Sequence, residues 1–366
     1  MGTPLKSPSS PKTVLFVPVS GPSGAGEYYR CLTVAEALAR RHPRLRLHFC
    51  LNRHAAAMRP EGFEYHLLKD TPTLDVEAVE RIMETLCPDM VVFDNTLRTR
   101  HLKKAKQVGA AIIYTSSRPR KRRKGFALHK LRYIDQHWVI APPFQHRLSF
   151  YERAALHLAK ARGPGFVAAV LPEPDNQRLE SLLAPYSFPL QGYTLFVSGG
   201  GGGTMNGIPT ADVFQQAARR YHKQTGEPTL LVSGPLSGNG LESDHHRLEL
   251  RAVSPGSLSD LIAGSMLVVS GGGSTAMHAL SLEKPCLAVP AGGKDQPVRI
   301  RQLAGENALA TCRPDAKSIA EASVCLAKDG EHRRQLSESA REKGFVNGLG
   351  RMVLAFEHVL SIADKS

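Results

Sequence analysis

The chain has 366 residues, 42% of them hydrophobic, which is enough for two ordinary domain cores. No run of about 18 apolar residues occurs, which argues against a transmembrane helix. Six scattered cysteines without a CxxC pair argue against a zinc or dithiol site and indicate a reducing cytoplasm. The formal charge of +14 predicts an anionic partner, whether a phosphorylated substrate, an acidic glycan, an anionic membrane or nucleic acid.

In the first half of the chain, short apolar runs alternate with segments of helical periodicity. A polar, Pro/Ser-rich leader over residues 1–12 precedes them and is expected to be disordered. Strands are predicted at residues 13–19, 45–51, 64–68, 90–93, 110–114 and 137–140, and helices at 28–41, 76–86 and 102–108. This alternation is typical of a parallel sheet that is covered by helices on both faces.

The second half repeats the pattern after a Gly/Pro-rich linker over residues 163–174. Strands are predicted at residues 193–197, 229–232, 247–253, 266–269 and 285–289, and helices at 211–225, 258–263, 275–282, 298–305, 316–328 and 352–363. The fold class predicted is α/β, with two doubly wound, Rossmann-like domains at 13–165 and 166–350. Residues 351–366 are expected to cross back to the first domain, and ligands are expected at the carboxyl ends of the strands, in a cleft that both domains face.

The glycine turn after the first strand, residues 21–26, is similar to two nucleotide-binding motifs but matches neither. A P-loop continues with Lys-Ser or Lys-Thr, and this turn continues with Glu27-Tyr28. A dinucleotide fingerprint has a third glycine where Tyr29 stands, and an acidic residue where Asn52 ends the second strand. We therefore expect backbone amides and Glu27 at the sheet edge, where Glu27 either takes part in catalysis or only favours the positive helix N-terminus.

The turn after the strand at 266–269 is more specific. It reads Ser-Gly-Gly-Gly-Ser-Thr over residues 270–275 and opens a helix. Gly272 and Gly273 let the backbone approach a ligand, and the amides of Gly273, Ser274 and Thr275 would point at it with the helix dipole behind them. This geometry predicts a pyrophosphate site, and the alternative is a tight connection without a ligand.

Two further loops would lie beside this turn in a parallel sheet. Gly199, Gly200 and Gly201 begin a run of five glycines that could contact the pyrophosphate or the sugar. After the strand at 285–289, Asp295 and Gln296 could form hydrogen bonds with sugar hydroxyls, and the alternative is a solvated loop.

Residues 269–280 (VSGGGSTAMHAL), residues 284–290 (KPCLAVP) and the pair Asp295-Gln296 resemble the C-terminal domain of the GT-B glycosyltransferases, above all the UDP-N-acetylglucosamine transferase of peptidoglycan synthesis. Residues 24–35 (GAGEYYRCLTVA) are similar to the same group and share an Arg-Cys-Leu run with the UDP-sugar hydrolase of pseudaminic acid synthesis. From about Lys12 onward the whole chain fits the two-domain plan. The resemblance implies the GT-B fold, a nucleotide-sugar donor site in the second domain, no bound metal and no cofactor.

Two positions depart from the resembled families. Glu27 replaces their histidine after the N-terminal glycines, and His278 replaces their glutamate on the helix after the C-terminal turn, where an imidazole can still bond a ribose hydroxyl. An inverting transferase needs a general base for the acceptor hydroxyl, and the candidates are Glu27 and Asp94. Asp94 ends a buried strand, and its alternative role is to cap a helix from residue 97 onward.

The segment after the strand at 110–114 carries six cations in seven residues. The resemblance places it near the acceptor and the membrane, so it is expected to be a loop that binds an anionic or lipid-linked acceptor or docks on an anionic membrane. Nucleic acid ranks lower because no aromatic residues interleave with the run, and a solvated loop is the remaining alternative. The cations are Arg118, Arg120, Lys121, Arg122, Arg123 and Lys124.

The leading hypothesis is an inverting, metal-independent glycosyltransferase of cell-envelope or polysaccharide synthesis. It would move a sugar from a nucleotide diphosphate, UDP by resemblance, to an acceptor hydroxyl at the cytoplasmic side of a membrane. The Arg-Cys-Leu run favours a nucleotide-sugar hydrolase instead. An epimerase shares the fold but usually brings extra carboxylates and histidines that cannot be placed in this sequence, and a non-catalytic basic binding protein on the same scaffold is the last alternative.

Overall fold

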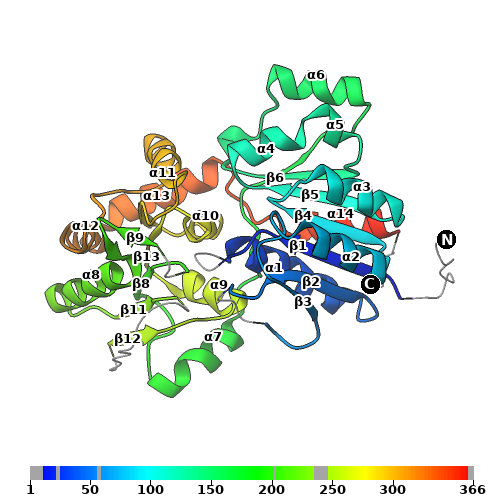
Figure 1. The fold of residues 1–366 in the computed structure, drawn as a ribbon. Coiled ribbons are helices and arrows are strands. Elements are labelled where there is room, and N and C mark those ends of the chain that lie inside the picture. Colours follow the sequence, from blue (N-terminus) through cyan, green and yellow to red (C-terminus); the bar gives the residue numbers. More distant parts are fainter. Residues whose placement is uncertain (1–10, 22–24, 56–58, 201–202, 235–245, 362–366) are drawn as a thin grey trace. The chain divides into compact units, whose positions relative to one another are not determined.

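The computed structural model describes residues 11–21, 25–55, 59–200, 203–234 and 246–361. The chain forms two compact units. The first unit runs to Val167 and takes up the chain again at Gly348, and the second spans Ala168–Asn347 (Figure 1). Each unit has its own parallel sheet and its own buried core.

The first unit is built on a seven-stranded sheet, ordered β3-β2-β1-β4-β5-β6-β7, in which every pairing is parallel. Its central strands are continuous apolar runs, buried because helices cover both faces. β2 and β3 lie on one side of β1, and β4 lies on its other side. The β1/β4 pair is therefore the switch point of a doubly wound sheet. The strands are β1 (Thr13–Pro18), β2 (Arg46–Asn52), β3 (Glu64–Leu68), β4 (Met90–Asp94), β5 (Ala111–Ser116), β6 (Gln136–Ile140) and β7 (Gly165–Val167).

Helices cover this sheet, and the last of them comes from the C-terminal end of the chain. The helices are α1 (Gly26–Arg41), α2 (Val76–Leu86), α3 (Thr99–Gln107), α4 (Pro119–Gly125), α5 (Leu128–Leu131), α6 (Phe150–Ala159) and α14 (Leu349–Leu360), with a 3-10 turn, η1, at Pro143–Gln145. α14 packs on α1, where Arg41 Nε and His42 Nε2 lie 2.8 and 2.7 Å from Glu357 Oε1.

The second unit holds a five-stranded parallel sheet, ordered β12-β11-β8-β13-β14, which places its switch point between β8 and β13. The strands are β8 (Thr194–Val197), β11 (Thr229–Val232), β12 (Arg247–Leu250), β13 (Leu267–Gly271) and β14 (Cys286–Val289), with a separate hairpin of β9 (Thr204–Met205) and β10 (Ile208–Pro209). The helices are α7 (Asn176–Leu183), α8 (Thr210–Thr225), α9 (Pro255–Gly264), α10 (Ser274–Ser281), α11 (Gln296–Gly305), α12 (Ala316–Lys328) and α13 (Gly330–Glu342), with a 3-10 turn, η2, at Ala184–Tyr186.

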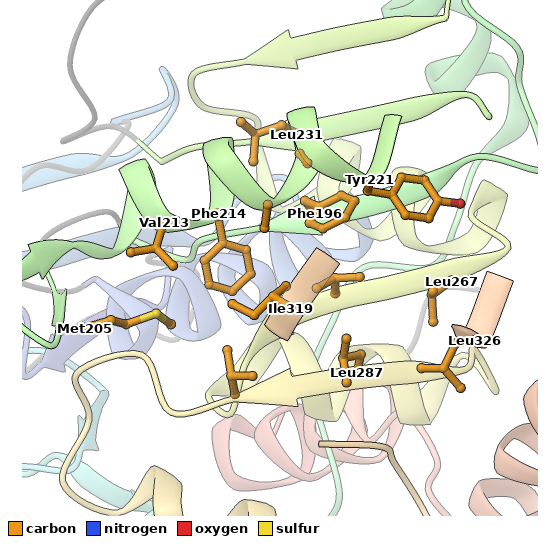
Figure 2. Close-up of a cluster of buried hydrophobic side chains, with 14 of the residues drawn as sticks. Phe196, Met205, Val213, Phe214, Tyr221, Leu231, Leu267, Leu287, Ile319 and Leu326 are labelled. Atoms are coloured by element: carbon orange, nitrogen blue, oxygen red, sulfur yellow. The ribbon is translucent and has the colours of Figure 1, made fainter. Parts of the chain in front are cut away.

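Figure 2 shows the core between this sheet and the helices α8 and α12. Phe196 of β8, Phe214 of α8 and Ile319 of α12 are fully buried there. The hydroxyl of Tyr221, at the rim of the same core, lies 2.9 Å from Thr194 Oγ1, so its polar end is satisfied. These contacts hold the sheet against α8 and α12, and the glycine loops extend from the carboxyl ends of its strands.

The two sheets confirm the predicted fold class, since both have the strand order of a doubly wound, Rossmann-like domain. The leader and the end of the last predicted helix fall largely outside the described residues. Among the residues that the structure describes, no helix combines the length and apolar composition that a membrane crossing requires.

Several elements were not predicted from the sequence. The segment expected to be a linker contains β7, and α6, α7, α13 and the β9–β10 hairpin were also missed. β7 lacks the usual apolar pattern because its first residue is Gly165, where a β-carbon would lie 2.4 Å from Trp138 Cζ3. The indole ring of Trp138 occupies the space that a side chain on β7 would fill.

Candidate functional site

Three loops of the second unit meet at the carboxyl edge of its sheet. They follow β8, β13 and β14, which are neighbours in the strand order and run parallel. A β-carbon at Gly292 would lie 3.2 Å from Gly203 Cα, and one at Gly271 would lie 2.7 Å from Ala291 Cβ. The loop after β14 therefore touches both of the other loops at positions that only glycine fits. The structure thus brings the three predicted glycine loops together.

The turn between β13 and α10 has one glycine that packing does not explain. Gly271 has no room for a side chain, and a β-carbon at Gly272 would lie 2.4 Å from Ile300 Cδ1. At Gly273 the nearest atom is Gln296 Nε2 at 3.8 Å, which is an ordinary contact distance. A tight connection therefore accounts for two of the three glycines, and the third leaves the backbone open to a ligand.

Helix α10 begins at this turn without a side-chain cap, because its N-cap residue is Gly273. The amides of a first helical turn carry partial positive charge and need an outside acceptor. Ser274 is exposed and Thr275 is half-buried beside these amides. His278, half-buried, follows Ser274 by one helical turn and so lies on the same side of α10. The arrangement can hold a diphosphate on amides and hydroxyls, with an imidazole next to it.

Asp295 and Gln296 have partners inside the site. Gln296 Oε1 accepts a hydrogen bond from the backbone N–H of Ala291 at 2.6 Å. Arg299 Nη2 donates to Asp295 Oδ2 at 2.5 Å, and Arg299 Nη1 donates to the Gly272 carbonyl at 3.0 Å. These side chains hold the loop after β14 against the glycine turn. Arg299 was not predicted, although its helical spacing from Asp295 is a local signal that could have indicated it.

The loop after β8 contains Gly199 and Gly200, both exposed. Gly199 has φ +82°, a left-handed conformation that favours glycine. Ser198 Oγ donates to the Ser233 carbonyl at 2.6 Å and so fixes the start of this loop to the end of β11. Gly201, also a predicted donor residue, lies outside the described residues.

In the first unit, Glu27 lies in the first turn of α1, beyond the carboxyl end of β1. It is 9% exposed, and its Oε1 accepts hydrogen bonds from Asn95 Nδ2 at 3.0 Å and from Arg118 Nη2 at 3.1 Å. Asn95 has φ 56° and also exchanges hydrogen bonds with Ser117 at 2.8 and 3.1 Å. Within the described residues no donor approaches Oε2, so Glu27 is a fixed carboxylate with one oxygen able to accept a proton.

Asp94, the other candidate base, lies in a buried ion pair. Its carboxylate is 1% exposed and accepts two hydrogen bonds from Arg30, Nε to Oδ2 and Nη2 to Oδ1, both at 2.7 Å. Burial raises the pKa of Asp94, and the guanidinium opposes that rise. Both oxygens are therefore engaged with Arg30 and shielded from solvent, which favours Glu27 over Asp94 as the base. Asp94 is a structural partner of Arg30, and since α3 begins only at Thr99, it is not a helix cap either.

The basic run after β5 forms a helix, α4, and not the expected loop. Lys121 Nζ donates to the Asn95 carbonyl at 2.6 Å. Arg122 forms a bidentate pair with Glu152 of α6, at 2.7 and 2.8 Å. Lys121 and Arg122 therefore fasten α4 to the turn after β4 and to α6, so their charges are engaged within the first unit.

The remaining cations of the run divide into two groups. Arg118 donates to Glu27 and so places a positive charge beside the candidate base. The other three are exposed and form what we call the exposed cationic face: Arg120, Arg123 and Lys124. Figure 1 shows α4, α5 and α6 together at one end of the first unit. On α6, three large apolar side chains are 81%, 55% and 69% exposed: Phe150, Tyr151 and Leu158.

Comparison with known proteins finds similarity in structure but not in sequence. No family model and no curated protein matches the sequence. The calicheamicin glycosyltransferase CalG4 is 15% identical with a TM-score of 0.61, over 96% of this chain and 98% of that chain. MurG of Acinetobacter baumannii is 11% identical with a TM-score of 0.59, over 95% and 100%. A proposed UDP-N-acetylglucosamine 2-epimerase from Listeria monocytogenes is 12% identical with a TM-score of 0.57, over 97% and 98%.

These similarities extend over nearly the whole of each chain, so they concern both units and not one shared domain. At such low identity they establish the fold and leave the activity to the chemistry of the site. Together with the two Rossmann-like sheets, they confirm the resemblance expected from the glycine motifs: the chain has the two-domain GT-B fold.

Proposed function

We propose that the protein is an inverting glycosyltransferase whose donor is a sugar linked to a nucleoside diphosphate, UDP in the first place. One observation carries the proposal: the uncapped N-terminus of α10 stands where three glycine loops meet, at the switch point between β8 and β13. Backbone amides at such a place bind nucleotide phosphates. A glycosyltransferase and a proposed UDP-sugar epimerase among the structural neighbours support a sugar nucleotide as the ligand.

In the proposed donor site, the amides and hydroxyls of Ser274 and Thr275 hold the diphosphate, and His278 bonds a ribose hydroxyl. The second oxygen of Asp295 and the amide group of Gln296 are left to bond the sugar. When the sugar is transferred, negative charge gathers on the departing diphosphate, and fixed amide dipoles at a helix N-terminus stabilise it. We propose that these backbone groups perform this role and that no metal ion is required for it.

Glu27 is the proposed general base. In an inverting transfer, the acceptor oxygen bonds the anomeric carbon while the bond from that carbon to the diphosphate breaks, and the acceptor proton goes to a base. Asn95 and Arg118 hold Oε1 of Glu27 and so fix the orientation of the carboxylate. Oε2 is then the atom that receives the proton.

A hydrolase is the second candidate, because water could take the place of the acceptor in the same site. The shared Arg-Cys-Leu run favours this reading. In the structure, however, Arg30 belongs to the buried pair with Asp94, and Cys31 lies beside that pair. Burial raises the pKa of the Cys31 thiol well above its ordinary value, so the thiol stays neutral. These residues stabilise the sheet edge, which reduces the weight of the run as a signal for hydrolysis.

Release of free nucleoside diphosphate distinguishes these activities. The purified protein is incubated with a panel of nucleotide sugars, with and without acceptor hydroxyls that include lipid-linked glycans. Turnover that requires an acceptor supports the transferase, and turnover in water alone supports the hydrolase. A new sugar nucleotide without net release of diphosphate indicates an epimerase. Failure to bind any nucleotide sugar in a calorimetric titration contradicts all three and leaves a non-catalytic binding protein on this scaffold.

We also propose that α4 and α6 place the acceptor side of the first unit against the cytoplasmic face of an anionic membrane. Each residue of the exposed cationic face would contribute about 1 kcal/mol near such a surface. The three exposed apolar side chains of α6 can enter the interface beside them. Because the Arg122–Glu152 pair joins the two helices, both approach one surface together. A lipid-linked or anionic acceptor in that membrane would then lie near the acceptor side of the first unit.

A further inference from the structure

Three side chains of metal-binding type lie on one face of the first unit's sheet. His48 belongs to β2, and Glu64 and His66 belong to the edge strand β3; we call them the histidine–glutamate cluster. In the parallel register His48 is opposite Glu64, and His66 is two residues further along β3, so all three side chains are on the same face. One ligand atom from each lies within 4.8 Å of the other two.

Two of the three distances in this cluster are those of ligands around one ion. His48 Nδ1 lies 3.2 Å from His66 Nε2 and 3.3 Å from Glu64 Oε2. Two ligand atoms bound at 2.0–2.1 Å to a tetrahedral zinc ion are about 3.3 Å apart. The distances from His48 Nδ1 to His66 Nε2 and to Glu64 Oε2 therefore already match this separation. The remaining distance, from Glu64 to His66, can adjust because the Glu64 side chain is 66% exposed and free to rotate.

His48 Nδ1 faces both His66 Nε2 and Glu64 Oε2. Nδ1 carries at most one hydrogen, which cannot form good hydrogen bonds with both atoms. A divalent cation between the three atoms would accept a lone pair from each.

We propose that the histidine–glutamate cluster binds a divalent transition-metal ion, Zn²⁺ by its nitrogen and oxygen ligands, with water as the fourth ligand. β3 is an edge strand with one buried position out of five, so packing alone holds it weakly. The ion joins this strand to β2. The cluster lies toward the amino ends of the two strands, whereas Glu27 lies beyond the carboxyl edge, so the ion stabilises the sheet edge and takes no part in sugar transfer.

Titration with Co²⁺ tests the site, on the full chain without a histidine tag and after treatment with a chelator. We expect one equivalent of Co²⁺ to give the visible absorption bands of a tetrahedral site and Zn²⁺ to displace it. His66→Ala and Glu64→Gln should each weaken binding by about 10-fold or more, since even an outer partner of a metal ligand is worth about 10–100-fold. His129→Ala, which removes an exposed histidine of α5, is the matched control and should bind as the wild type does.

The Glu64→Gln variant keeps the test decisive if His66→Ala does not fold, because Glu64 is exposed. At the same concentration, Zn²⁺ should raise the thermal midpoint of the wild type clearly more than that of Glu64→Gln. No binding by the wild type at neutral pH, or equal affinity in the wild type and both cluster variants, would overturn the proposal. Diphosphate release by Glu64→Gln should equal that of the wild type, so failure of the metal site and failure of the proposed transferase are separate results.

Discussion

Replacing Gly273 by alanine should separate ligand binding from folding at the glycine turn. A β-carbon there meets nothing closer than Gln296 Nε2 at 3.8 Å, and φ at Gly273 is −90°, outside the left-handed region. The free energy of unfolding should therefore change by less than about 1 kcal/mol. The added methyl would stand where the proposed diphosphate approaches the first-turn amides of α10. Losing one hydrogen bond to a charged group costs about 1.5–3 kcal/mol, or roughly 10- to 150-fold in the Kd for UDP.

Gly272→Ala is the matched control, because its β-carbon would lie 2.4 Å from Ile300 Cδ1. Overpacking of this kind costs about 1–3 kcal/mol of unfolding free energy. Ile300→Ala removes the crowded atoms, so the double variant should lose less than the sum of the two single variants. Calorimetric titration with UDP and urea denaturation measure the two effects. If Gly273→Ala binds UDP as tightly as the wild type, or unfolds as readily as Gly272→Ala, this account of the turn is wrong.

Four further predictions concern the first unit. Glu27→Gln should reduce turnover by about 10²–10⁴-fold with UDP affinity unchanged, and full turnover would exclude Glu27 as the base. Asp94→Asn leaves the Arg30 charge buried without a counter-charge and should cost about 3–5 kcal/mol in urea denaturation; normal stability with lost turnover would make Asp94 a base candidate again. Replacing the exposed cationic face with glutamines, which keep the helix, should weaken binding to anionic liposomes at low salt and leave neutral liposomes unaffected, and unchanged binding would refute the docking proposal. Burial lowers the pKa of His101 to about 4. Because the unfolded chain takes up this proton first, the free energy of unfolding should fall by up to about 3 kcal/mol as the pH drops from about 6.5 to 4, and His101→Phe should flatten that fall. An equal fall in His101→Phe would count against this assignment.

Most of the fold could be predicted from local sequence because parallel sheets bury their strands on both faces. The runs that became β1, β4 and β8 are continuous and apolar, so their positions followed from composition alone. β7 was missed because the ring of Trp138 fills the place of a side chain at Gly165. α6 could have been found, since Ser149 and Glu152 form a capping box at its start.

The same difference between local and long-range signals explains which parts of the candidate site could be predicted. The glycine loops were predictable because the backbone freedom they need comes from glycines that are consecutive in the sequence. The roles of Asp94 and Arg122 were not, because their partners are 64 and 30 residues away in the chain. In the sequence each looked like a free charged group at the sheet edge. Only the folded chain shows that each belongs to an ion pair.

The central claim is that the loops around α10 hold the diphosphate of a sugar nucleotide for transfer to a hydroxyl. Its most direct test is the release of UDP from UDP-sugars by the wild-type protein, measured with and without an acceptor. We predict binding of UDP and release that depends on the acceptor. Absence of UDP binding, with no other nucleoside diphosphate able to replace it, would contradict the account.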